Sequence, residues 1–130
     1  MIENLDPQQA WDLLQNNPDA VLVDVRSSVE YAFVGHPPGA LLIPWKEAPD
    51  WQVNPHFVAN VKHVAANPAA PVLLLCRSGQ RSLDAAKALE AAGYQWLINI
   101  VDGFEGALDA HKHRGNLGGW RFQGLPWEQS

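Results

Sequence analysis

The chain has 130 residues, with 9 Lys+Arg against 14 Asp+Glu for a formal net charge of −5, and it contains one cysteine. This length suits one domain with its own core, and we expect residues 1–130 to form a single domain. A single cysteine excludes an intramolecular disulfide framework and an all-cysteine zinc site, and the acidic balance argues against a nucleic-acid partner. The charge is uneven, because residues 1–70 hold 3 basic and 8 acidic residues whereas residues 71–130 hold 6 of each.

No stretch of the chain predicts export or membrane insertion. Residues 1–6 are acidic and lack the basic start and apolar run of a signal peptide. The longest apolar stretch, 69–76, has about a third of the length of a membrane span and is interrupted by Pro71. Because a lone free thiol persists in a reducing compartment, we expect a cytoplasmic protein with no membrane partner.

The first part of the chain predicts one helix and two strands. Asp6, Pro7 and Gln9 have the pattern of a capping box with proline at the first helical position, and they predict a short helix. The run 20–25 is apolar apart from one aspartate and predicts a strand that is covered on both faces. A second short strand is predicted at 41–43, after a turn rich in glycine and proline.

The second part continues the alternation of helices and strands. A helix is predicted from position 54, because apolar residues recur at helical spacing at Phe57, Val58, Val61, Val64 and Ala65. A strand at 72–75, a helix at 82–92, a strand at 97–101 and a short helix at 106–112 follow, before an irregular tail over 115–130 that packs on the domain. The predicted fold class is α/β, with a small, mostly parallel sheet of four to five strands flanked by helices on both faces.

The segment with the clearest chemistry follows the strand at 72–75 and reads Cys76-Arg77-Ser78-Gly79-Gln80-Arg81-Ser82. It joins the carboxyl end of a buried strand to a helix N-terminus, which is where open α/β sheets bind ligands. Gly79 allows the chain to curl, while Arg77 and Arg81 flank the thiol and favour a thiolate and an anionic substrate. An isolated cysteine is more often buried and inert, but this loop favours a reactive one.

Three further motifs accompany the loop, and together they resemble a known family. The loop is similar to the active-site loop of single-domain rhodaneses, which are thiosulfate sulfurtransferases and their relatives. The resemblance spans roughly residues 5–127 and includes Asp24-Val25-Arg26 with Glu30-Tyr31, Gly35-His36-Pro37-Pro38-Gly39-Ala40, and Gly119-Trp120-Arg121 with Gly124-Leu125-Pro126-Trp127. The chain departs from the family at Phe104 and Leu108, where many members have a second glycine and a tryptophan.

The resemblance implies a rhodanese-like fold and sulfur transfer in two steps. Cys76 is then the nucleophile, which takes a sulfur from a small anionic donor such as thiosulfate and passes it to cyanide, a thiol or a sulfur-accepting protein. The persulfide would lie in a cradle of amides formed by Arg77, Ser78, Gly79, Gln80, Arg81 and Ser82. Arg81 would close the loop, and Arg77 is the candidate for holding the oxyanion of the donor.

Two other functions fit parts of the sequence. A sulfur-relay or protein-binding module would keep the cysteine but turn over small donors poorly. A phosphatase or arsenate reductase is the lesser alternative, because the related phosphatases place five residues between cysteine and arginine, whereas four, 77 to 80, separate Cys76 from Arg81. No second cysteine is present to resolve an oxidised intermediate.

Four further residues are interpreted as supporting the site rather than reacting. Asp24 and Arg26 are expected to be structural, with Arg26 in a salt-bridge network to Glu30 and Asp24 near the floor of the pocket. His36 is expected to make hydrogen bonds within its own turn, because a thiolate activated by amides and arginines needs no paired base. No metal cluster and no glycine-rich nucleotide motif is present, so neither a metal nor a cofactor is predicted.

The tryptophans are numerous, with six in the chain. Trp11 is interpreted as part of a helix core, and Trp120 and Trp127 as anchors of the tail. Trp45 and Trp51 lie in the connection that follows the strand at 41–43 and are predicted to border the pocket and shape access of the acceptor.

Overall fold

The computed structural model describes residues 1–130 and contains one sheet of five strands in the order β1-β5-β4-β2-β3. All four strand pairs are parallel. In chain order the strands are β1 (Ile2–Leu5), β2 (Val21–Asp24), β3 (Leu41–Leu42), β4 (Val72–Leu75) and β5 (Leu97–Ile100). The helices are α1 (Pro7–Asn16), α2 (Phe57–Val64) and α3 (Gln80–Ala91), and a π-helical segment η1 spans Glu30–Val34.

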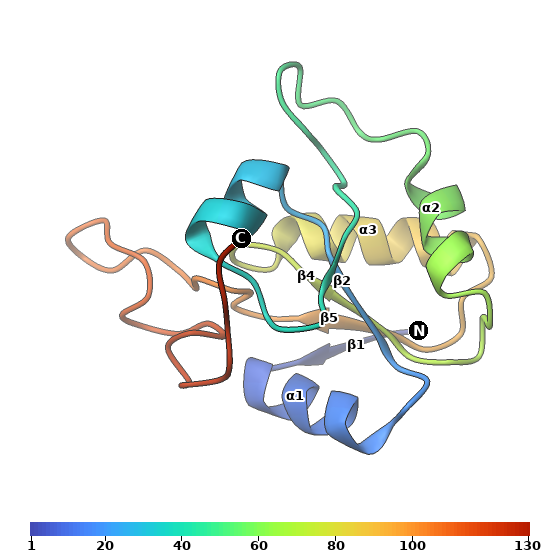
Figure 1. The fold of residues 1–130 in the computed structure, drawn as a ribbon, viewed down its shortest axis with the longest axis horizontal. Coiled ribbons are helices and arrows are strands. Elements are labelled where there is room, and N and C mark those ends of the chain that lie inside the picture. Colours follow the sequence, from blue (N-terminus) through green and yellow to red (C-terminus); the bar gives the residue numbers. More distant parts are fainter.

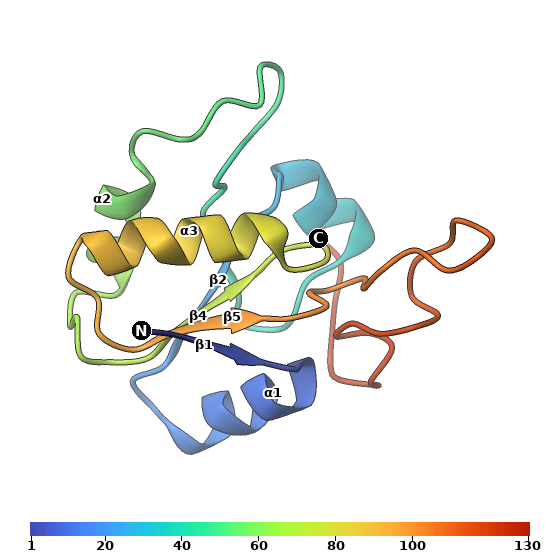
Figure 2. The same cartoon turned by 180° about the vertical axis from the view of Figure 1, so that it is seen from behind.

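The sheet separates two apolar layers. Figures 1 and 2 show α1 on one face and α2 and α3 on the other. Side chains alternate along the central strand β4, so Val72, Leu74 and Cys76 pack in the layer beneath α2 and α3, while Leu73 and Leu75 pack in the layer with α1. Because both faces are covered, the buried strands are continuously apolar, as predicted for a parallel sheet.

The predicted fold class is confirmed, and so is the start of the first helix. The amide of Gln9 donates to the Asp6 carboxylate at 2.8 Å, and the amide of Asp6 donates to the Gln9 side chain at 3.0 Å. These reciprocal bonds form the capping box, with Pro7 at the start of α1. Strands β2, β4 and β5 lie within their predicted runs.

The predicted helix at 106–112 is wrong, because this segment forms turns and bends instead. The Asp109 carboxylate accepts the amides of His111 and His113 at 2.8 and 2.9 Å and the side-chain amide of Asn116 at 2.7 Å. A short acidic side chain that binds nearby amides in this way stabilises a turn in place of a helix. Lys112 has a positive φ of 62°, which also interrupts helical geometry.

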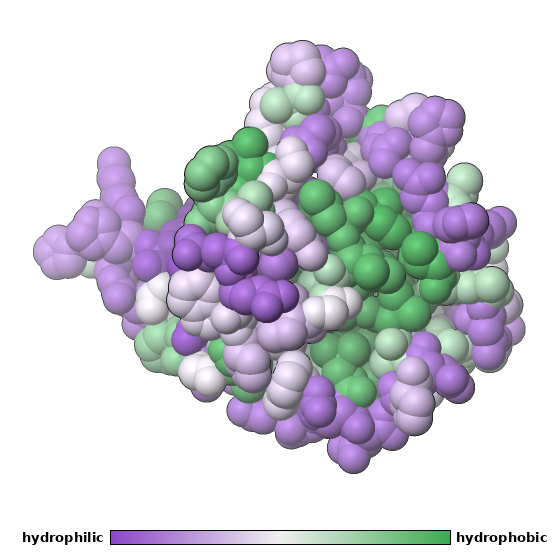
Figure 3. Space-filling model, viewed as in Figure 1, coloured by the Kyte–Doolittle hydropathy of each residue, from purple (hydrophilic) through white to green (hydrophobic).

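The tail over 115–130 contains no helix or strand and is anchored by an aromatic core. Trp120 is fully buried, meets Trp11 edge to face at 5.7 Å, and donates its indole N–H to the Pro126 carbonyl at 2.7 Å. At the far edge of the sheet, Leu41 and Val64 remain partly exposed, and Figure 3 shows apolar surface over this side of the molecule. No helix has both the length and the apolar character needed to cross a membrane.

Candidate active site

The cysteine loop joins β4 to α3 at the carboxyl end of the sheet. Cys76 is buried, and Gly79 occupies the helix N-cap with a left-handed φ of 112°. This conformation, which favours glycine, brings the Gly79 amide to 3.1 Å from Cys76 Sγ, to which it donates a hydrogen bond. An amide aimed at the sulfur stabilises negative charge on it.

A second polar group reaches the sulfur from the first turn of α3. Ser82 Oγ lies 3.2 Å from Cys76 Sγ and 2.6 Å from Asn99 Oδ1, and all three residues are buried. Because a hydroxyl has one proton, Ser82 can donate to the carboxamide oxygen or to a thiolate, but not fully to both. Ser82 was predicted only as a cradle amide, and its side-chain contact with the sulfur requires the helical turn that the structure provides.

The other side of the loop is held by a turn after β5. The amide of Phe104 donates to the Cys76 carbonyl at 2.8 Å, and the amides of Glu105 and Gly106 donate to the Arg77 carbonyl at 3.0 and 3.2 Å. In a trans peptide the carbonyl and the following N–H point in opposite directions. With these two carbonyls bound by the turn, the amides of Arg77 and Ser78 point away from it.

Arg81 forms a bidentate ion pair with Glu30. The two guanidinium nitrogens lie 2.8 and 2.9 Å from the two carboxylate oxygens, and both side chains are largely buried. Burial raises the pKa of Glu30, but the hydrogen bonds and charge of Arg81, together with hydrogen bonds from Ser27, outweigh it and lower that pKa from 4.5 to about 2. The pair ties the cysteine loop to η1.

This ion pair predicts a pH dependence of stability. Since the pKa of Glu30 is lower in the folded than in the unfolded chain, its contribution is present above pH 4.5 and is lost as the pH falls toward 2. Wild type should lose about 2 kcal/mol relative to Glu30→Gln between pH 6 and pH 3, measured by urea denaturation. Parallel pH dependence in the two proteins would contradict this prediction.

The predicted partner of Arg26 is wrong. Arg26 binds Asp24, with Nε 2.9 Å and Nη2 2.6 Å from its carboxylate oxygens, and also donates to the Gly35 carbonyl at 2.6 Å. Both side chains of the ion pair are fully buried, and the guanidinium carbon lies 4.6 Å from the centroid of the Phe104 ring. Arg26 and Glu30 therefore belong to two separate ion pairs, and each has its own opposite charge.

His36 links its turn to the tail. Its amide donates to the Glu128 carbonyl at 2.8 Å and its carbonyl accepts the Glu128 amide at 2.9 Å, while its ring meets Tyr31 edge to face at 3.7 Å. Burial lowers the pKa of His36, although the nearby carboxylates of Asp24 and Glu128 oppose this. The expectation that its bonds stay within the turn is corrected, because the bonded strand partner lies at the chain end.

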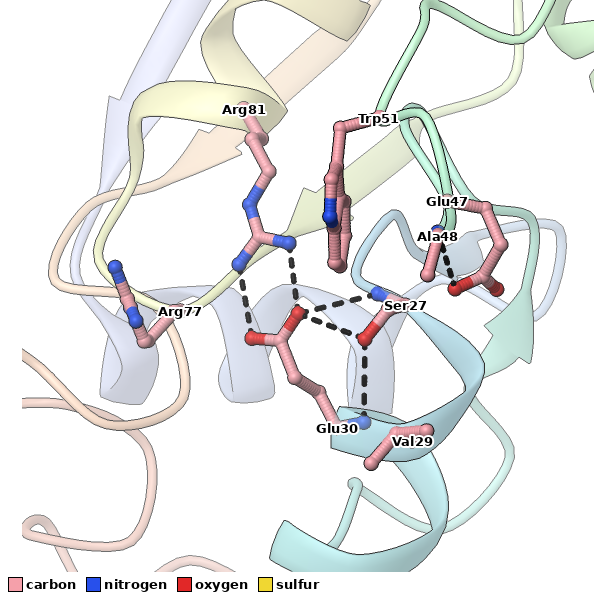
Figure 4. Close-up of a pocket in the computed structure, with 8 residues that line it drawn as sticks. All are labelled: Ser27, Val29, Glu30, Glu47, Ala48, Trp51, Arg77 and Arg81. Atoms are coloured by element: carbon pink, nitrogen blue, oxygen red, sulfur yellow. Dashed lines mark hydrogen bonds and ion pairs between the residues drawn. The ribbon is translucent and has the colours of Figure 1, made fainter.

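A pocket of about 540 Å³ opens beside the loop (Figure 4). Arg77 and Arg81 line it, whereas Cys76 lies buried at the base of the loop. The remaining lining residues come from the start of η1 and from the connection after β3, namely Ser27, Val29, Glu30, Glu47, Ala48 and Trp51. Ser78 and Gln80 are exposed and do not line this pocket.

The two tryptophans of the connection after β3 have different positions. Trp51 lines the pocket, as predicted, and is half exposed. Trp45 does not line it, but meets Phe57 edge to face at 5.2 Å and packs on the core. The departures from the family pattern also lie outside the pocket, because Phe104 is fully buried beside Arg26 and Leu108 is exposed on the surface.

Comparisons with known proteins agree with this fold and loop. The model of the rhodanese-like domain family matches residues 6–110. An uncharacterized protein of Rickettsia rickettsii is 34% identical over 132 residues and is covered, like this chain, over 98% of its length. Thiosulfate sulfurtransferase GlpE of Haemophilus influenzae is 29% identical over 104 residues, which are 80% of this chain and 86% of that protein. The crystal structure of Rv0390 from M. tuberculosis superposes with a TM-score of 0.87 at 42% identity, covering 98% of both chains.

The chain belongs to the rhodanese-like domain family. The matched residues include both the cysteine loop and the segment that carries Glu30. The tail beyond residue 110, which contains Trp120 and the residues bonded to His36, lies outside the matched range.

Proposed function

We propose that the protein is a sulfurtransferase that carries sulfur as a persulfide on Cys76. The observation that supports this most directly is the hydrogen bond from the Gly79 amide to Sγ at 3.1 Å, within a loop that joins a buried strand to a helix N-terminus. A thiolate held in this way is a nucleophile that needs no paired base. The relatives at about 30% identity include thiosulfate sulfurtransferases.

The reaction balances with a thiosulfate-like donor and a thiophilic acceptor. The Cys76 thiolate forms a bond to the outer sulfur of thiosulfate, the S–S bond of the donor breaks, and its electron pair leaves with sulfite. Cyanide or a thiolate then bonds to the outer sulfur of the persulfide, and the electron pair of that S–S bond returns to Cys76. The Gly79 amide and the Ser82 hydroxyl stabilise the negative sulfur in both steps.

Two features favour sulfur transfer over phosphoryl transfer. Only four residues, 77 to 80, separate Cys76 from Arg81, so the loop is tighter than one that encloses a tetrahedral phosphoryl group. Both terminal nitrogens of Arg81 are bound to Glu30, which leaves this guanidinium committed to the protein rather than free to bind phosphoryl oxygens.

Intact mass after incubation with thiosulfate tests the proposal. Wild type is expected to gain one sulfur, and cyanide should remove it with release of thiocyanate. Cys76→Ser is the matched control, because it keeps the size of the side chain and should gain nothing. The proposal fails if wild type gains no sulfur, and rapid hydrolysis of an aryl phosphate by that same protein would favour the phosphatase alternative.

A further inference from the structure

We propose that the pocket in Figure 4 selects organic sulfane donors, namely monoanions such as thiosulfonates that carry an apolar body, and that Trp51 recognises this body. The inference rests on the proposed sulfur transfer at Cys76 and specifies the class of donor. Three observations carry it: the volume of the pocket, the balance of its charges, and the apolar wall opposite the loop.

The volume exceeds what an inorganic donor needs. The pocket of about 540 Å³ has room for roughly 18 water molecules at about 30 Å³ each. Pockets of about 300–1,000 Å³ bind organic ligands of substantial size. Thiosulfate would fill only a small part of this space and would remain largely hydrated at its mouth.

The charges of the lining do not favour a dianion. Arg81 is neutralised by Glu30, with both oxygens within 2.9 Å. Glu47 adds a second carboxylate, which accepts the amide of Ser28 at 2.9 Å. With two arginines and two glutamates the lining has no formal net charge, and Arg77 is the one cation there without a carboxylate partner. Such a site suits a single negative charge held at Arg77.

The expectation of a locally cationic site, drawn from Arg77 and Arg81 in the sequence, therefore needs correction. Sequence proximity counted both arginines as free, but Glu30 lies 51 residues away in the chain and neutralises one of them.

The wall opposite the loop is apolar. Figure 4 shows the Trp51 ring standing between Arg81 and the backbone at Ala48, with Val29 on the η1 side. Trp51 is 49% exposed although it is a large aromatic residue. Its backbone is fixed, because its amide donates to the Glu47 carbonyl at 3.0 Å and a bridge pairs Lys46 with Val53. An exposed aromatic ring on a fixed loop offers a preorganised surface for an apolar ligand.

The chemistry of the first step is unchanged with such a donor. The Cys76 thiolate bonds to the terminal sulfur of R–SO₂–S⁻, the S–S bond breaks, and the electron pair leaves with the sulfinate R–SO₂⁻. The Cys76 persulfide that results is the same as with thiosulfate. The body R would lie against Trp51, and Arg77 would hold the sulfonyl oxygens.

Benzenethiosulfonate and methanethiosulfonate test the inference, because they differ only in R. We expect wild type to use the benzene compound with a kcat/KM about 10-fold higher, and Trp51→Ala to abolish most of this preference. Trp51→Phe should retain most of it, since an aromatic ring remains. Phe122→Ala is the control, because Phe122 is 54% exposed in the tail and does not line the pocket, and it should keep the wild-type ratio.

The outcomes separate this inference from the function on which it rests. A ratio near one in wild type, or a ratio that Trp51→Ala leaves intact, overturns the role of Trp51 and of the apolar body. A sulfur gained from thiosulfate on Cys76 by the same preparations would leave the sulfurtransferase proposal standing in either case. If no donor adds sulfur to wild type, the proposed function itself is overturned.

Discussion

Replacing Arg26 with methionine is expected to lower the free energy of unfolding by about 3–5 kcal/mol. The substitution keeps most of the side-chain volume but leaves the Asp24 carboxylate fully buried without its cation. It also removes the hydrogen bond to the Gly35 carbonyl, so two buried acceptors lose their donor. Domains of this kind have total stabilities of about 5–15 kcal/mol, so the variant should unfold at much lower urea concentration.

The double variant Asp24→Asn with Arg26→Met provides the control. It removes both charges, so it should recover a large part of the stability lost in Arg26→Met. Urea denaturation of wild type, the single variant and the double variant measures the coupling. A loss below about 1 kcal/mol in Arg26→Met would show that Asp24 finds another partner or is protonated, and would contradict this description of the pair.

The sequence predicts the buried part of the sheet well, because physics acts there through a simple pattern. The runs at β2, β4 and β5 are continuously apolar, and only a strand covered on both faces explains them. β1 could not be found in this way. It pairs only with β5 at the sheet edge, and its central residues Glu3 and Asn4 are exposed, so it lacks the apolar signature.

The site is predicted in its loop but not in its ion pairs. The order cysteine, glycine, arginine within seven positions is local, and local geometry places the Gly79 amide on the sulfur. The partners of Arg26 and Arg81 are set by tertiary packing instead. Glu30 lies close to Arg26 in the chain, yet η1 directs it to Arg81, and no buried residue within η1 marks that segment in the sequence.

The loop is consequently held from two sides by segments far apart in the chain. Glu30 binds Arg81 on the pocket side, and the turn at 103–106 binds the carbonyls of Cys76 and Arg77 on the other. The first contact sets the charge of the pocket, and the second sets the direction of the loop amides. A change in the turn should therefore affect the reaction without touching any pocket residue.

Gly103→Ala is expected to slow persulfide formation about 100-fold, because a displacement of about 1 Å at a reacting group has an effect of that size. A Cβ at this position would lie 2.4 Å from the Cys76 carbonyl oxygen and 2.6 Å from the Arg77 carbonyl carbon, both of which belong to the backbone. Backbone cannot rotate away as a side chain does, so the turn and the loop must move apart. The separation would break the bonds that hold the two carbonyls and would rotate the amides relative to Sγ.

Gly93→Ala is the matched control for the backbone strain of alanine at positive φ. Gly93 has a φ of 103° but no atom within 4 Å of an added Cβ, whereas Gly103 has a φ of 59° with its contacts on the loop. Both variants should lose about 1–2 kcal/mol of stability from the left-handed conformation, but only Gly103→Ala should lose the reaction. The rate of sulfur gain on Cys76 from thiosulfate, followed by intact mass under conditions where both variants are folded, measures the difference. Equal rates in the two variants would show that the contacts of the turn do not position the loop.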